Sequence, residues 1–82
     1  MHVNEQIADE LALEALKLIE ATGNDDIVND IAKTIGASST TLEESFLTAV
    51  RVRRAEARAR ALIEAAKARV AESDGAAQSP SS

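Results

Sequence analysis

Cysteine is absent from the 82-residue chain, and aromatic side chains are almost absent. Without cysteine the protein has no disulfide bond and no thiolate metal site, so the sequence does not reveal its redox compartment. Phe46 is the single aromatic residue, so a hydrophobic core must be built mainly from Leu, Ile, Val and Ala. Such a core is small for a chain of this length, and we therefore expect the protein to self-associate.

Histidine is equally scarce, because His2 is the only one and lies in a segment that we expect to fray. The three glycines are isolated from one another, so no glycine-rich phosphate loop is present. The acids Asp25, Asp26 and Asp30 fit the start of a helix better than a metal site, since negative charge is favourable there. We therefore predict that the protein is not an enzyme and uses neither a metal ion nor another cofactor.

Long hydrophobic runs are missing as well. No apolar segment approaches the roughly 20 residues that a membrane-spanning helix requires. The N-terminus also lacks a basic stretch followed by an apolar run, which is the pattern of a signal peptide. These absences predict a soluble cytoplasmic protein without a membrane partner.

Charge is present but unevenly distributed. Residues 1–48 contain ten acidic residues and two lysines, which gives a charge of −8. Residues 49–72 contain six arginines and one lysine against three glutamates, which gives +4. Such asymmetry indicates either an anionic partner for the basic segment or self-complementary pairing, although a solvated basic helix face would also produce it.

The apolar periodicity predicts an all-α protein with three main helices. The first helix should begin after Asn4 and run to about Thr22, where Gly23 can end it in the left-handed conformation. Its buried face should comprise Ile7, Ala8, Leu11, Ala12, Ala15, Leu16, Leu18 and Ile19. A second helix should follow the cap residues 24–26 and end at Gly36.

The third helix should begin with a capping box, formed by Thr40 with Glu43 or by Thr41 with Glu44. No glycine or proline then interrupts the chain before Gly75. A single helical domain is expected over residues 1–72. The serine-, alanine- and glycine-containing segment 73–82 has no apolar pattern and is predicted to be a disordered tail.

The apolar stripe of this third helix changes face part of the way along. Residues 42, 46, 49 and 50 lie on one side, whereas the apolar residues from Val52 to Val70 lie about 140° around the helix axis. The helix must therefore either face two different partners or break near Val50–Arg53.

Residues 30–46 have the spacing of a helix-turn-helix motif. Ala32 is followed by Gly36 four positions later, Ser38 two positions later and Leu42 four positions later. A small residue at 32 allows the two helices to cross closely, and Gly36 would let the chain turn in a left-handed conformation. Such a motif presents its second helix to the major groove of DNA.

The stretch from about residue 13 to residue 46 resembles the N-terminal DNA-binding domain of tetracycline-repressor-type transcriptional regulators. The matching residues are Asp30, Ile31, Ala32, Gly36, Ser38, Thr41, Leu42 and Phe46. The resemblance implies a three-helix head that binds DNA. The chain departs from the family at Glu43, where a tyrosine that contacts the DNA backbone is usual.

These observations predict a small DNA-binding regulator of transcription, without catalytic activity, that works as a homodimer on double-stranded DNA. Hydroxyl groups at the start of the recognition helix and arginines on one side of the next segment could contact phosphates and bases. They are Ser38, Ser39, Thr40, Thr41, Arg51, Arg54 and Arg58. The same hydroxyls could instead only cap the helix, and the arginines could form a solvated face with Glu56–Arg60 as an ion pair.

The second apolar stripe predicts the dimer interface, formed by Val52, Ala55, Ala59, Leu62, Ile63, Ala66 and Val70. The alternative function is a helical protein–protein interaction module, such as an adaptor or anti-activator, that does not bind DNA. The acidic first half of the chain favours this alternative because it would repel DNA.

Overall fold

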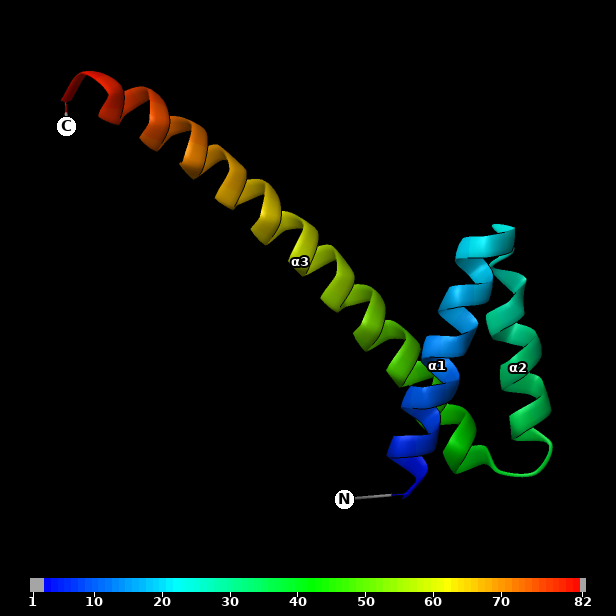
Figure 1. Cartoon of the computed structure of the whole chain (residues 1–82). Helices are drawn as coiled ribbons and strands as arrows, with labels where there is room; N and C mark the ends of the chain where they lie inside the picture. Colours follow the sequence, from blue (N-terminus) through cyan, green and yellow to red (C-terminus); the bar gives the residue numbers. More distant parts are fainter. Residues whose placement is uncertain (1–2, 82) are drawn as a thin grey trace.

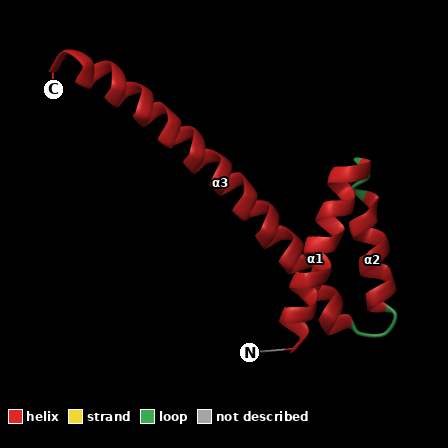
Figure 2. Cartoon of the chain, in the orientation of Figure 1, coloured by secondary structure: helices red, strands yellow, loops and turns green. Residues whose placement is uncertain are grey.

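The computed structural model describes residues 3–81, with side chains described as far as residue 73, and these residues form α-helices without a strand (Figure 1 and Figure 2). The helices are α1 (Val3–Thr22), α2 (Asp26–Gly36) and α3 (Thr40–Ser81). The first two lie side by side as a hairpin, and α3 crosses them before it projects away from the hairpin (Figure 1). The all-α class that the sequence predicts is confirmed.

The turn between α1 and α2 is set by the residues that end α1. Gly23 has a φ of 72°, and no other described residue has a positive φ. Its N–H donates to the carbonyl of Ile19 at 2.6 Å. Asn24 then accepts the N–H of Asp26 on its Oδ1 at 3.0 Å. The predicted end of the first helix is thus confirmed, while its start lies at Val3 rather than after the expected cap residue.

Gly36 ends α2 in a helical conformation and not in the left-handed conformation expected from the motif. Its lack of a side chain has a different role. A Cβ built on Gly36 would lie 2.5 Å from Oε1 of Glu43, so the glycine leaves room for this carboxylate against the end of α2.

The cap of α3 also differs from the prediction. The Oγ of Ser39 accepts the N–H of Leu42 at 3.1 Å, so Ser39 is the residue whose side chain caps the helix. The predicted capping boxes at Thr40 and Thr41 are wrong because α3 already begins at Thr40, which moves the cap to the preceding residue.

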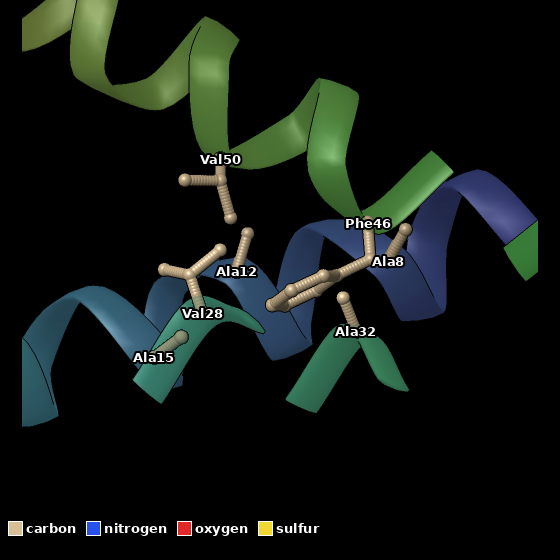
Figure 3. Packing of buried hydrophobic residues seen from close by; sticks show 7 residues of the cluster. All are labelled: Ala8, Ala12, Ala15, Val28, Ala32, Phe46 and Val50. Atoms are coloured by element: carbon tan, nitrogen blue, oxygen red, sulfur yellow. The ribbon is translucent and has the colours of Figure 1, made fainter. Parts of the chain in front are cut away.

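The hydrophobic core lies where the three helices meet (Figure 3). Phe46 and Val50 of α3 are buried there, together with Val28 and Ala32 of α2. On α1 the buried residues are alanines, at positions 8, 12 and 15. Because alanine side chains are short, the backbones of α1 and α3 can approach each other closely at this crossing. Larger residues surround the crossing; Leu11, Leu16 and Ile19 are partly buried, whereas Ile7 and Leu18 are exposed despite the prediction.

The third helix is continuous, so the predicted break near residues 50–53 does not occur. Its first three turns pack on α1 and α2 in the hydrophobic core, and no residue of α3 beyond Val50 belongs to that core. Arg53 and Arg54 still make polar contacts with Asp9 and Asp25 before the helix projects away from the hairpin (Figure 1). We call α1, α2 and residues 40–50 the head, and residues 51–73 the arm. The change of apolar face in the sequence therefore marks the boundary between head and arm. The helix continues to Ser81. The disordered tail over residues 73–82 stays a prediction, and Ser82 lies outside the described residues.

Candidate functional site

The hydroxyl residues predicted to contact DNA lie at the start of α3. Ser38 belongs to the connection after α2, and its side chain is exposed together with those of Thr40 and Thr41. Ser39 is half-buried and its hydroxyl caps the helix, as described above. One of the four candidate hydroxyls thus has a structural role, and three are accessible.

The candidate arginines lie along α3, away from these hydroxyls. Arg51 and Arg58 are exposed. Arg54 donates from one of its terminal nitrogens to Oδ1 of Asp25 at 3.1 Å, which ties it to the N-terminal end of α2. The hydroxyl residues follow the opposite, C-terminal end of α2, about 16 Å away along an 11-residue helix. The structure therefore does not gather the predicted DNA-binding residues into one compact site.

Arg53, which we did not select from the sequence, makes the strongest polar contact between α1 and α3. Its Nε donates to Oδ1 of Asp9 at 2.8 Å and a terminal nitrogen donates to Oδ2 at 2.6 Å. Its other terminal nitrogen reaches Oε1 of Glu56 at 3.2 Å. The hydrogen bonds from Arg53 lower the pKa of Asp9 below its ordinary value, and those from Arg60 and Arg53 lower the pKa of Glu56.

The Arg53–Asp9 pair joins residues 44 positions apart, so no local spacing rule could reveal it. The sequence feature that pointed to a contact of this kind was the opposite net charge of the two halves of the chain. In contrast, the Glu56–Arg60 pair expected from the i,i+4 spacing is confirmed, with 2.9 Å between Arg60 Nε and Glu56 Oε2.

Acidic side chains surround the accessible hydroxyls. Glu44 is exposed and, by helical register, lies on the same side of α3 as Thr40 and Arg51. Glu43 covers the end of α2, where Lys33 is the basic residue in the last turn. Carboxylates repel phosphate groups, so the local charge opposes DNA binding at this end of the head.

The residues predicted to form a dimer interface do lie on one side of the arm. Their four large side chains are well exposed, with fractions of 59% for Val52, 65% for Leu62, 51% for Ile63 and 57% for Val70. Ala55 and Ala59 are exposed and Ala66 is half-buried. We call these seven residues the arm stripe. No other described part of the chain covers it, and residues 63, 66 and 70 line a shallow hollow of about 450 Å³.

An open groove of about 580 Å³ lies where the N-terminal half of α1 meets α3. It contains three carboxylates and ends at the first residue of the arm stripe. Its lining residues are Glu5, Asp9, Thr41, Glu44, Ser45, Thr48, Ala49 and Val52. We call it the head groove. Sequence reasoning did not identify it because its two walls come from different helices.

Two further observations limit the kinds of site that the described residues contain. No three His, Asp or Glu side chains among them are grouped so that they could hold a metal ion, and His2 lies outside the described residues. Within the same part of the chain, no helix combines the length and apolar character needed to cross a membrane.

No known protein family, curated protein or solved structure compared with the chain matches it.

Proposed function

We propose that this protein is a non-catalytic protein–protein interaction module. In this module the arm projects from the head and pairs with a helix of another protein chain. The observation that carries the proposal is the arm stripe. It places four exposed large apolar side chains on one side of α3. This part of α3 projects from the head (Figure 1).

The arm leaves a large apolar area in contact with water. Full burial of a Val, Leu or Ile side chain contributes roughly 1.5–3 kcal/mol. The arm leaves Val52, Leu62, Ile63 and Val70 more than half exposed, whereas the head buries Phe46 completely. A second helix laid along the stripe would remove these side chains from water, and contiguous apolar surfaces of this kind mark interaction sites.

Site-specific photo-crosslinking in the cells that make the protein tests this function. A photoreactive residue at position 62 or 70 should give a covalent adduct to a protein chain. The same residue at Thr34, which is exposed on α2 away from the stripe, should give none. If the stripe positions yield no more adduct than position 34, the interaction function is wrong.

DNA-binding regulation is the second candidate, and one observation favours it. Residues 37–39 form a short connection between α2 and α3, and Ala32 and Phe46 on either side of it are buried in the core. This arrangement supports the helix-turn-helix interpretation of residues 30–46. The acidic surroundings of Thr40 and Thr41 and the intramolecular pairing of Arg54 weigh against it.

Selection from a random pool of duplex DNA at moderate salt tests the second candidate. Enrichment of a palindromic motif would support a dimeric regulator. Replacement of both Arg51 and Arg58 by alanine should then weaken DNA binding. It should also lower the number of counterions released on binding, measured from the slope of the affinity against salt concentration, by about two. If folded protein enriches no sequence, the DNA-binding function is rejected and the interaction function is unaffected.

A further inference from the structure

We propose that the half of the arm stripe nearest the head binds an amphipathic helix of a different protein, and that this helix carries two carboxylates seven residues apart beside its apolar seam. The proposal rests on the function proposed above and names the chemistry of the partner. Two features of the arm lead to it: the spacing of the stripe residues, and the arginines Arg51 and Arg58 beside them.

The stripe has the spacing that helix pairing requires. Positions 52, 55, 59, 62 and 66 are separated alternately by three and four residues, which is the repeat that keeps one seam of a helix facing a partner. Alanines at 55, 59 and 66 allow the two helices to approach closely, while Val52 and Leu62 supply larger apolar surface. A partner helix with the same repeat can therefore lie along the arm.

Arg51 and Arg58 lie at equivalent places on one edge of this seam. They directly precede Val52 and Ala59, which are one seven-residue repeat apart. Residues at such places form the ion pairs between paired helices that select the partner. Both arginines are exposed, and neither forms an ion pair with any residue whose side chain is described. The seam thus has two available cations on one edge, about 10 Å apart along the helix.

The remaining charges of the arm are balanced within the chain. Residues 51–60 contain five arginines and one glutamate, which gives +4. The three arginines at 53, 54 and 60 each form an ion pair with a carboxylate of the same chain. Residues 61–72 contain two cations and two glutamates and are neutral. The unbalanced positive charge therefore lies at Arg51 and Arg58, in the half of the arm nearest the head.

A parallel pair of identical arms would not supply acids for both arginines. In such a pair the residue five positions later in the other copy lies opposite each arginine. Opposite Arg51 this residue is Glu56, which already bonds to two arginines of its own helix. Opposite Arg58 it is Ile63, which has no charge.

An antiparallel pair of identical arms has the same deficiency. The edge that carries Arg51 and Arg58 then meets the same edge of the other copy. The equivalent positions along this edge are 51, 58, 65 and 72, and Glu72 is the one carboxylate among them. One carboxylate cannot pair with two arginines about 10 Å apart. A different helix with carboxylates seven residues apart can pair with both arginines in either orientation.

The head limits where the acids of the partner can lie. Glu44 is seven residues before Arg51 and therefore on the same side of α3, and it lines the head groove together with Glu5 and Asp9. These carboxylates repel an acidic side chain that reaches beyond Arg51 towards the head. The acids of the partner should consequently lie opposite residues 51–58.

The apolar stripe favours a protein helix over DNA as the partner of these arginines. Phosphate groups could pair with Arg51 and Arg58, but they would leave Val52 and Leu62 in contact with water. An amphipathic helix buries the apolar side chains and pairs with the cations at the same time.

Photo-crosslinking from position 62 in the cells that make the protein, with the cross-linked segment identified by mass spectrometry, tests the partner. We expect a helical segment of a different protein with two Asp or Glu residues seven positions apart. Arg51→Gln with Arg58→Gln should lower the adduct yield several-fold. Lys17→Gln with Lys33→Gln removes the same charge from exposed positions of the head and should leave the yield nearly unchanged.

The identity of the adduct separates a failure of this partner from a failure of the proposed function. An adduct to a second copy of this chain, or to a segment without such carboxylates, would overturn the acidic helix and preserve the interaction function. No adduct above that from position 34 would reject both. Equal effects of the two pairs of variants would show that only net charge matters and would also overturn the partner.

Two synthetic peptides test the chemistry with the purified protein. Each has three seven-residue repeats and the same Leu and Ala seam, flanked by glutamates in one peptide and by lysines in the other. In fluorescence anisotropy at low salt, we expect the glutamate peptide to bind more tightly. Arg51→Gln with Arg58→Gln should raise its dissociation constant roughly fivefold.

Equal affinity for the two peptides, or no binding of the glutamate peptide at millimolar concentration, would overturn the acidic partner. A mixed-sequence DNA duplex serves as the competing probe in the same assay. Binding of the duplex that is lost in the variant with Arg51→Gln and Arg58→Gln, without binding of the glutamate peptide, would assign these arginines to DNA instead.

Discussion

Phe46 is the single aromatic side chain of the protein, and it lies where the three helices meet (Figure 3). Replacement of a buried Phe by Ala costs about 3–5 kcal/mol, which is most of the stability of a small domain. We expect Phe46→Ala to unfold most of the protein, as measured by circular dichroism during urea denaturation. Leu13→Ala, at a partly exposed position on α1, should cost less than about 1 kcal/mol. A folded Phe46→Ala variant of near-normal stability would contradict this core.

Gly23 follows α1 and Gly36 ends α2, and the two positions favour glycine for different reasons. Gly23 has a positive φ, so Gly23→Ala should cost about 1–2 kcal/mol. Gly36 is helical, and a Cβ there meets only the flexible carboxylate of Glu43. Gly36→Ala should therefore change the stability by less than about 1 kcal/mol, and should be stabilising in a Glu43→Ala background. A cost for Gly36→Ala equal to that for Gly23→Ala in chemical denaturation would contradict this distinction.

The Asp9–Arg53 ion pair gives the stability a defined dependence on pH. The pKa of Asp9 is lowered in the folded state, so the pair stabilises the protein above the ordinary Asp pKa of about 3.9. This contribution is lost as the pH falls through the lowered value. Asp9→Asn should thus be less stable than the natural protein at pH 7, and the difference should be smaller at pH 3, below the ordinary pKa of Asp. Urea unfolding at both pH values measures it, with Asp30→Asn as a control that removes an exposed charge.

At the scale of the elements, the crossing of α1 over α3 depends on small residues. Ala12 is fully buried in this crossing, and a larger side chain would force the two helices apart. We expect Ala12→Leu to destabilise the protein by about 1–3 kcal/mol. Ala21→Leu adds the same side chain at an exposed position of α1 and should change the stability by less than about 0.5 kcal/mol. Thermal unfolding of the two variants compares these effects, and equal midpoints would contradict the close crossing.

At the scale of the whole molecule, the arm makes the single chain elongated. The radius of gyration of its Cα atoms is 19.0 Å, whereas a compact domain of this length would have about 12 Å. Small-angle X-ray scattering of the Ile63→Glu variant, which should prevent pairing through the stripe, is expected to give a value close to 19 Å. A value near 12 Å would mean that the arm folds back onto the head.

The sequence by itself determined the features that depend on neighbours along the chain. Gly23 and Asn24 marked the turn after α1, and the apolar periodicity identified Ala8, Ala12 and Phe46 as core positions. The change of apolar face near Val50 also located the boundary between head and arm, because a residue's side of a helix follows from its position alone.

Only the tertiary structure decided which distant groups meet. It joined Arg53 to Asp9 and Arg54 to Asp25, and thereby showed that these arginines have acidic partners within the chain. It also placed Glu43 over Gly36, and it formed the head groove from α1 and α3. Such contacts depend on how the helices pack across tens of residues, and a periodic pattern contains no information about the relative orientation of two helices. For that reason the local features of the candidate DNA-binding residues were visible in the sequence, while their separation in space was not.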